Sequence, residues 1–294
     1  MNSNGSKGYK IFRVINTMVM ILIVAVTFIP FLNLVAQSFS SERFITAGEV
    51  FLLPKGFNLT TYRAVLSNKR FWIHYKNTIL YTVVGTILGL FLTTLLAYVL
   101  AKPKTRLKFK GFWVGFSVFT MFFSGGIIPT YILYNNTLKI TNTMWSVVLP
   151  GALSIYNMLI MKSFFETLPP ALEEAAAVDG MSTYGIFLKI ILPLSKPILA
   201  TMTLFYAVAY WNSWFQAFMF LDDWRLFPVT LYLRNLISGA MATGEAAAAE
   251  AGSTQIASNV RSVAMVLSIL PIVMVYPFVQ KYFVTGIMLG SVKE

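Results

Sequence analysis

Residues 78–101 read TILYTVVGTILGLFLTTLLAYVLA, an apolar run that contains no charged side chain. A helix needs about 20 mostly apolar residues to cross the hydrocarbon core of a bilayer, so this run predicts a membrane-spanning helix. Five further stretches have the same character: Val14 to Gln37, Phe112 to Leu133, Thr143 to Ile160, Ile198 to Leu221, and Val263 to Phe283. The sequence therefore predicts an all-α membrane protein with six transmembrane helices.

The composition of the whole chain agrees with a lipid environment. Of its 294 residues, 57% are hydrophobic and 12% are charged, whereas an ordinary soluble domain carries about 25% charged residues. The chain has no cysteine, which excludes a disulfide scaffold and a thiolate metal site.

Two of the six stretches need closer inspection, the first because it could be a signal peptide and the third because its apolar pattern is interrupted. A basic tail before the first apolar run is typical of a signal peptide, but the run is too long and no Ala-x-Ala spacing lies near its end, so we expect a retained helix. In the third stretch, Ser124, Gly125, Gly126 and Pro129 interrupt the apolar pattern. Such residues predict a kink or a break.

Lysine and arginine in the short loops predict the orientation. The tail 1–13 and the loop after the second helix are basic, whereas the loop after the third helix has only Lys139. Both tails, 1–13 and 285–294, are therefore predicted to be cytoplasmic, and the long loops 38–77 and 222–262 external. We interpret the net charge of +12 as this topology signal and as contact with anionic lipid, and not as nucleic-acid binding.

The external loop 222–262 is rich in small residues. Its middle, from Ser238 to Ser258, contains mostly Gly, Ala and Ser and has little apolar surface to bury, so we expect weak order unless a partner orders it. The alternative is an idle linker. Loops of this length in compact proteins are more often functional.

The segment 165–193 between the fourth and fifth helices is charged and interrupted by Pro and Gly. Proline and acids favour a first helical turn, and glycine favours the position after a helix end. We therefore expect a short helix from Pro170 to Asp179, stopped at Gly180, and a second helix from Thr183 to Ile191 that ends before Pro193. The alternative is an amphipathic linker helix on the membrane surface.

The first of these two helices has features of a docking surface. Ala175, Ala176 and Ala177 would leave a thin surface that another protein can approach closely. Glu174 would offer a carboxylate beside that surface to an Arg or Lys of the partner.

The spacing Glu174-Ala175-Ala176, Gly180, Ile190 and Leu192-Pro193 is similar to the EAA-loop signature of permease subunits of binding-protein-dependent ATP-binding-cassette (ABC) importers. The resemblance implies the type I ABC importer permease fold, with this loop as a coupling helix that docks into a cleft of the ATPase. An aspartate directly before the motif glycine, as at Asp179, is similar to the pattern of the carbohydrate-uptake branch of these permeases. The stretches 123–130 and 142–145 resemble its maltose G-type and LplC-like subgroup.

The resemblance also implies the partners and the location. The chain would work in a bacterial cell membrane with a second homologous permease subunit, two ABC ATPase subunits and an extracytoplasmic solute-binding protein. ATP and Mg would be bound by the ATPases, since the chain has no phosphate-binding Gly-x4-Gly-Lys-Ser/Thr loop. We therefore expect a non-catalytic subunit with no catalytic residue, metal or cofactor of its own.

Sugars are bound by aromatic faces together with side-chain amides and hydroxyls. The fifth apolar stretch offers five candidates for a sugar path: Tyr206, Tyr210, Trp211, Asn212 and Gln216. Trp214 would share a helical face with the two tyrosines. The alternative is an aromatic belt at the outer membrane interface.

Other functions stay open at this point. The solute of an ABC importer need not be a sugar. An ion-coupled transporter is less favoured, because no acid lies inside the six stretches. A membrane enzyme would need a catalytic cluster, and His74, the only histidine, is expected in an external loop as an interfacial residue. Gly85 and Gly89 predict close helix packing, within this chain or with a sister subunit.

Overall fold

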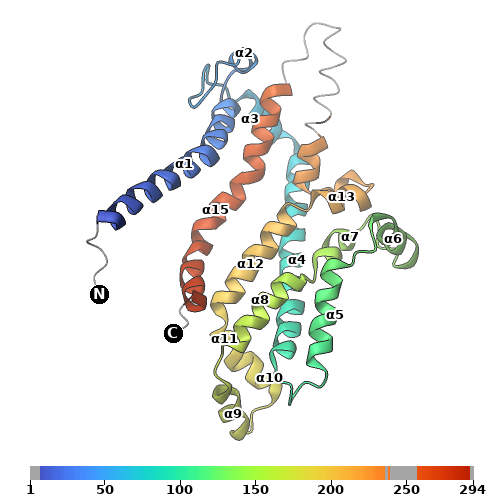
Figure 1. Ribbon diagram of the computed structural model, residues 1–294. Helices are drawn as coiled ribbons and strands as arrows, with labels where there is room; N and C mark the ends of the chain where they lie inside the picture. Colours follow the sequence, from blue (N-terminus) through green and yellow to red (C-terminus); the bar gives the residue numbers. More distant parts are fainter. Residues whose placement is uncertain (1–6, 236–237, 239–256, 292–294) are drawn as a thin grey trace. The chain divides into compact units, whose positions relative to one another are not determined.

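The computed structural model describes residues 7–235, 238 and 257–291. Their secondary structure is helical (Figure 1), apart from one isolated antiparallel bridge between Ser40 and Phe57. Most of the predicted weakly ordered stretch, Ser238 to Ser258, lies outside the described residues. The chain divides into two compact units, residues 1–68 with 233–270 and residues 69–232 with 271–294.

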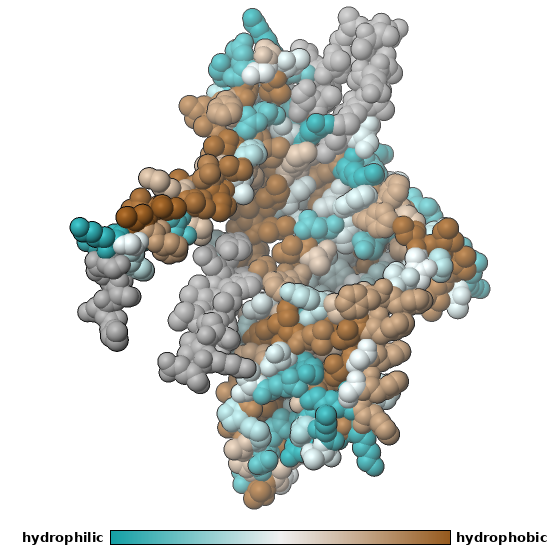
Figure 2. All heavy atoms as spheres, viewed as in Figure 1, coloured by the Kyte–Doolittle hydropathy of each residue, from teal (hydrophilic) through white to brown (hydrophobic). Residues whose placement is uncertain are grey.

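The first unit is built around the helix α1. Its helices are α1 (Lys7–Ser38), α2 (Glu42–Thr46), α3 (Thr60–Ser67) and the first part of α15 (Ala257–Ser291). Apolar side chains along α1 are exposed (Figure 2), as expected of a surface that faces lipid. Just after the C-terminal end of α1, a polar contact joins this segment to α15: Asn259 Nδ2 donates to the Ser40 carbonyl at 3.1 Å.

The second unit is centred on α4, which packs against α8 and α12. Its elements in chain order are α4 (Lys69–Ala101), α5 (Lys110–Phe122), α6 (Ile127–Ile132), the π-helical turn η2 (Leu133–Thr137), α7 (Met144–Val148), the 3₁₀ turn η3 (Leu149–Gly151), α8 (Ile155–Glu166), α9 (Pro170–Val178), α10 (Thr183–Ile186), the π-helical turn η4 (Phe187–Ile191), α11 (Leu192–Leu194), α12 (Lys196–Trp211), α13 (Trp214–Phe220) and the 3₁₀ turn η5 (Trp224–Leu226).

Two helices, Lys7–Ser38 and Lys69–Ala101, are each long and apolar enough to cross a membrane unbroken. Three bent pairs of helices raise that number to at most five, by length and composition. The break predicted in the third stretch is confirmed, because α5 and the helix Ile127–Thr137 meet at 105° across Gly126, which has φ +89°. The fourth stretch is also bent, by 46° between Met144–Gly151 and Ile155–Glu166.

The prediction of one continuous helix over residues 198–221 is wrong. The helix α12 ends at Trp211, and α13 begins at Trp214. At this point short polar side chains form hydrogen bonds to backbone carbonyls: Asn212 Nδ2 donates to Val208 O at 2.9 Å, and Ser213 Oγ donates to Tyr210 O at 2.6 Å. Such bonds compete with helix continuation, so Trp214 does not continue the face of the two tyrosines.

The start of α4 was also predicted wrongly. The helix begins at Lys69 and contains His74, which the sequence placed in the loop 38–77. His74 is only 1% exposed, and its Nδ1 lies 3.0 Å from the carbonyl oxygen of Phe227. Because a carbonyl only accepts, Nδ1 carries the proton in this contact. His74 is thus a buried packing residue of the second unit.

The glycine pair in α4 packs against α12 of the same chain. A Cβ atom added to Gly85 would lie 2.5 Å from the ring of Tyr210, and one added to Gly89 would lie 2.7 Å from the ring of Tyr206. Both distances are too short for carbon atoms, so only glycine permits this approach. The structure therefore identifies the neighbour of the predicted packing surface as intramolecular.

Candidate functional site

The helical hairpin 165–195 contains the sequence motif. Its first helix, α9, begins at Pro170 in the first turn, has Glu173 as a first-turn acid and ends at Val178 with Asp179 as its cap. Gly180 follows with φ +78°, a conformation that costs other residues energy. The predicted helix and its glycine stop are thus confirmed to within one residue.

The second part of the hairpin differs from the prediction. Pro193 does not end the helix, which continues through α10, η4 and α11 to Leu194. A proline normally clashes with the carbonyl four residues earlier, and the wider π-helical turn Phe187–Ile191 directly before α11 relieves this constraint. The chain then bends by 81° into α12.

The helix α9 has two distinct faces. Its exposed face contains Ala171, Glu174, Ala175 and Val178 at helical spacing, and Val178 is 86% exposed. Ala176 is buried on the opposite side, at 5% exposure. The expectation that all three alanines form one thin exposed surface is therefore wrong for Ala176. Its small side chain instead allows α9 to pack closely on the rest of the second unit.

The buried face of the hairpin joins a core shared by several helices. Its buried members are Ala97, Tyr98, Leu100, Met158, Met161, Phe165, Ala176, Ile186, Phe187, Ile191 and Met202. Ile190 and Leu192 of the motif pack against this core. The second half of the motif thus fixes the hairpin on α4, α8 and α12, whereas Pro193 is exposed.

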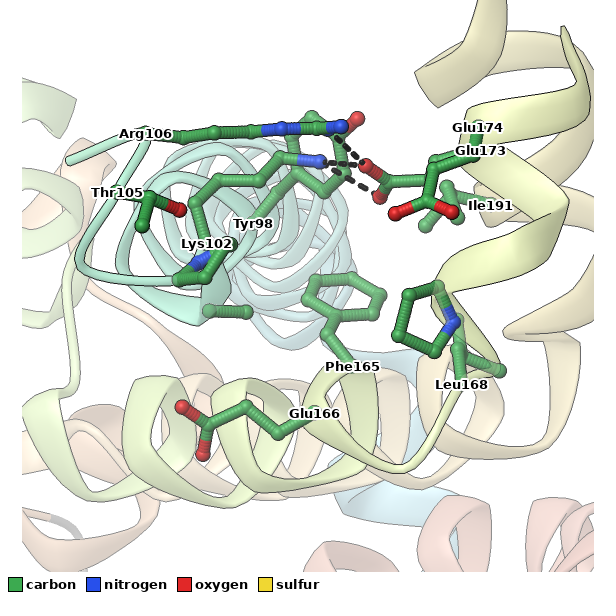
Figure 3. A pocket seen from close by; sticks show the side chains of 13 residues that line it. Tyr98, Lys102, Thr105, Arg106, Phe165, Glu166, Leu168, Glu173, Glu174 and Ile191 are labelled. Atoms are coloured by element: carbon green, nitrogen blue, oxygen red, sulfur yellow. Dashed lines mark hydrogen bonds and ion pairs between the residues drawn. The ribbon is translucent and has the colours of Figure 1, made fainter.

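Glu173 makes ion pairs with the loop that follows α4 (Figure 3). Lys102 Nζ donates to its two carboxylate oxygens at 2.6 and 2.5 Å, and Arg106 Nη1 lies 3.3 Å from Oε2. The Lys102 ammonium also lies 3.7 Å from the centre of the Tyr98 ring. Burial lowers the pKa of Lys102, and the hydrogen bond and the charge of Glu173 oppose that shift.

A hollow with a volume of about 380 Å³ lies beside these ion pairs (Figure 3). It is lined by Tyr98, Ala101, Lys102, Pro103, Thr105, Arg106, Phe165, Glu166, Leu168, Pro170, Glu173, Glu174 and Ile191. Within the part of the chain that the structure describes, no group of three or more His, Asp or Glu side chains could hold a metal ion.

Glu166 forms a second ionic network, which does not involve α9. Its carboxylate accepts from Lys110 at 2.8 Å and from Lys162 at 2.8 and 2.9 Å. Burial favours the neutral acid, but the hydrogen bonds from Lys110 and Lys162 outweigh it and lower the pKa of Glu166. This network ties the end of α8 to the start of α5.

The predicted sugar-path residues do not lie in one environment. Tyr206 and Tyr210 are buried, at 2% and 4% exposure. The Tyr206 hydroxyl bonds to Thr93 Oγ1 and to the Ser154 amide, and the Tyr210 hydroxyl donates to Val148 O at 2.8 Å. The two side chains thus pack α12 against α4, α7 and the start of α8, and their place on a sugar path stays a prediction.

The other three candidates lie at or beside the break between α12 and α13. Trp211 is buried and has its ring edge-on to Tyr75, with centroids 5.7 Å apart. Asn212 is exposed, and Gln216 is partly exposed.

Sequence reasoning missed Glu173, Lys102 and Arg106 as a structural unit. The basic residues of the loop after α4 were interpreted only as a topology signal, and the motif directed attention to Glu174. The available signal was helical spacing: Glu173 is three residues before the buried Ala176 and so shares its face.

Comparison with known proteins agrees with the motif. Residues 95–288 match the family described as "Binding-protein-dependent transport system inner membrane component". Protein LplC of Bacillus subtilis (strain 168) is 38% identical over 292 residues, which cover 99% of this chain and 97% of LplC. The polygalacturonan/rhamnogalacturonan transport system permease protein YtcP of the same organism is 36% identical over 271 residues, 90% of this chain and 92% of YtcP.

A solved structure agrees as well. It is the crystal structure of a bacterial ABC transporter involved in the import of the acidic polysaccharide alginate. One of its chains matches with a TM-score of 0.81 and 33% identity, and the match covers 95% of this chain and 98% of that one. The helical fold is thus the type I ABC permease fold, and the chain belongs to the family of inner membrane components of binding-protein-dependent transport systems.

Proposed function

We propose that this chain is the permease subunit of an ATP-driven oligosaccharide importer and that α9 is its docking element for an ATPase. The observation that carries the proposal is the exposed stripe Ala171, Glu174, Ala175 and Val178 on a helix whose opposite face is fixed to the core. A rigidly held helix with an exposed apolar and acidic stripe suits a groove in a partner protein.

The proposed assembly contains this chain, a second homologous permease, two ABC ATPase subunits and an external solute-binding protein. Six membrane spans, both tails and the loop 165–193 in the cytoplasm, and the segments between α1 and α4 and over 222–262 outside would place the ATPases on the cytoplasmic side and the binding protein on the external side. The basic tail and the basic loop after α4 support this orientation. ATP and Mg would be held by the ATPases.

The proposed substrates are oligosaccharides derived from acidic polysaccharides. Support comes from two relatives, because the name of YtcP refers to polygalacturonan and rhamnogalacturonan and the solved transporter takes part in alginate import. Asn212 and Gln216, beside the break between α12 and α13, are the proposed polar contacts along the path, with Trp211 next to them. A polar amide in a span is costly unless it faces the bundle or a cavity.

An uptake assay tests the function. The chain would be reconstituted in proteoliposomes with its second permease, ATPase and binding protein, and offered labelled oligosaccharides of polygalacturonan, rhamnogalacturonan, alginate and maltose type. We expect uptake of an acidic oligosaccharide that requires both ATP and the binding protein. Uptake that persists without ATP, or ATP-dependent uptake of no sugar in the panel, would contradict the proposal.

A matched pair of variants tests the docking role of the hairpin. Gly180→Val places a β-branched residue at φ +78° and should uncouple ATP hydrolysis from uptake, because β-branched side chains are strained there. Gly180→Asn is the control, since asparagine tolerates this conformation. Among the described residues, no atom lies within 4 Å of a Cβ added at Gly180, so the two variants differ in backbone strain and not in crowding. Equal, wild-type coupling in both would count against the hairpin as the coupling element.

A further inference from the structure

Two adjacent acids of α9 have different environments. Glu174 is exposed, whereas the Glu173 side chain is only 18% exposed and lies between Lys102 and Arg106. The sequence motif contains Glu174 and not Glu173. The geometry therefore separates an acid available to a partner from an acid used inside the chain.

The ion pair of Glu173 with Lys102 is largely removed from water. The Lys102 side chain is 15% exposed, and its ammonium is held both by the carboxylate and by the face of the Tyr98 ring. Pairs of this kind lose more when one partner is removed than exposed pairs do, because the remaining charge is left desolvated. Arg106 is half exposed and should contribute less.

These contacts connect α9 to the last turn of α4. Lys102 directly follows the end of α4, and Tyr98 is the residue one turn earlier. The Tyr98 ring in turn packs against Phe187 of the hairpin, with centroids 4.7 Å apart, and against Phe165 of α8 at 6.1 Å. A displacement of α9 thus has a direct non-covalent route to α4, the helix on which α8 and α12 pack.

We propose that Glu173, Lys102 and Arg106 form an intramolecular clamp that passes movement of α9 to α4, with Glu173 as its positioning residue. The proposal rests on the proposed function of α9 as the ATPase-docking helix. Glu174 and its exposed neighbours bind the ATPase, and the clamp keeps α9 attached to the transmembrane core while the helix moves.

A charge-swap cycle in the reconstituted complex tests the clamp. The variants are Glu173→Lys, Lys102→Glu and the double variant with both changes, and the readouts are co-purification of the ATPase and uptake per ATP hydrolysed. Each single variant should keep the ATPase bound but lower uptake per ATP about tenfold, since like charges then face each other in a poorly solvated place. The double variant should recover most of the loss, because it restores an ion pair of reversed direction.

The second ionic network supplies a matched control. Glu166→Lys, tested alongside, reverses a charge in the same region without touching α9. It should leave uptake per ATP within about twofold of wild type, because the Glu166 side chain is 37% exposed and the Glu173 side chain 18%. Single variants with normal uptake per ATP, a folded double variant with no recovery, or an equal loss in Glu166→Lys would each overturn the clamp. If the wild-type complex neither binds the ATPase nor hydrolyses ATP, the proposed function itself fails.

Discussion

The two ends of α4 each hold a segment that lies between longer helices, but they use different chemistry. At its start, side chains one turn apart bond to the backbone of residues 225–229: Asn77 to Arg225 O at 2.6 Å, Tyr81 to Leu226 O at 2.7 Å, His74 to Phe227 O at 3.0 Å, and Thr78 to the Val229 amide at 2.7 Å. At its end, Lys102 and Arg106 bind one side chain, Glu173.

The difference indicates what each end can do. Bonds to backbone groups do not depend on the side chains of the segment they hold, and a buried backbone group left unpaired costs free energy. The start of α4 is therefore a fixed attachment. An ion pair depends on two particular side chains and persists over small changes of geometry, so the end of α4 suits a segment that moves. We expect changes in the middle of α4 to lower stability most, changes at its start to lower it less, and changes in the partly exposed ionic network around Glu166 to lower it least.

The largest effect is expected in the middle of α4, on which both ends depend. Gly85→Leu would drive a side chain into the Tyr210 ring, where even a Cβ lies 2.5 Å away, and Tyr210 is fixed by its hydrogen bond to Val148. We expect a loss of about 3 kcal/mol of stability, measured as thermal unfolding of the purified complex in detergent. Gly115→Leu is the control, because no atom of the described part of the chain lies within 4 Å of a Cβ added there. Equal melting temperatures of the two variants would refute the packing assignment.

A smaller effect is expected at the start of α4. Thr78→Val keeps the shape of the side chain but removes the acceptor of the buried Val229 amide, which should cost about 1–3 kcal/mol. Faster hydrogen exchange of residues 224–232 would report the released segment. Thr203→Val is the matched control, since Thr203 is exposed and its hydroxyl donates to Leu199 O of its own helix. Unchanged exchange in Thr78→Val would show that this end is not a fixed attachment.

The smallest effect is expected in the network around Glu166. Lys162→Gln removes one of two cations from a carboxylate whose side chain is 37% exposed, so the loss of stability should stay under about 1 kcal/mol. Thermal unfolding measures it beside Thr78→Val. A larger loss than in Thr78→Val would reverse the proposed ranking of neutral and ionic contacts.

The sequence predicted those features that follow from local rules. The helix from Pro170, its stop at Gly180 and the break near Gly126 were predicted because Pro and Gly have strong backbone preferences. The EAA-like spacing identified the family, since it specifies residues on both sides of that stop.

The features that the sequence did not predict depend on contacts distant in the chain. Whether Tyr206 and Tyr210 face a path or a neighbour depends on Gly89 and Gly85, more than a hundred positions earlier. The role of Glu173 required knowing where Lys102 lies. The helix through Pro193 required a π-helical turn, which has no simple sequence signal.

The exposed stripe of α9 is proposed to contact an ATPase directly. Because the chain contains no cysteine, a photoactivatable cross-linker can be attached to a single introduced thiol, at Val178→Cys or at Phe122→Cys. These side chains are 86% and 84% exposed, so access to the reagent is matched. Irradiation of the assembled complex should cross-link the ATPase to the Val178→Cys chain, with a yield that changes when ATP is added, and not to the Phe122→Cys chain. No ATPase cross-link from Val178→Cys, or an equal one from Phe122→Cys, would contradict the claim.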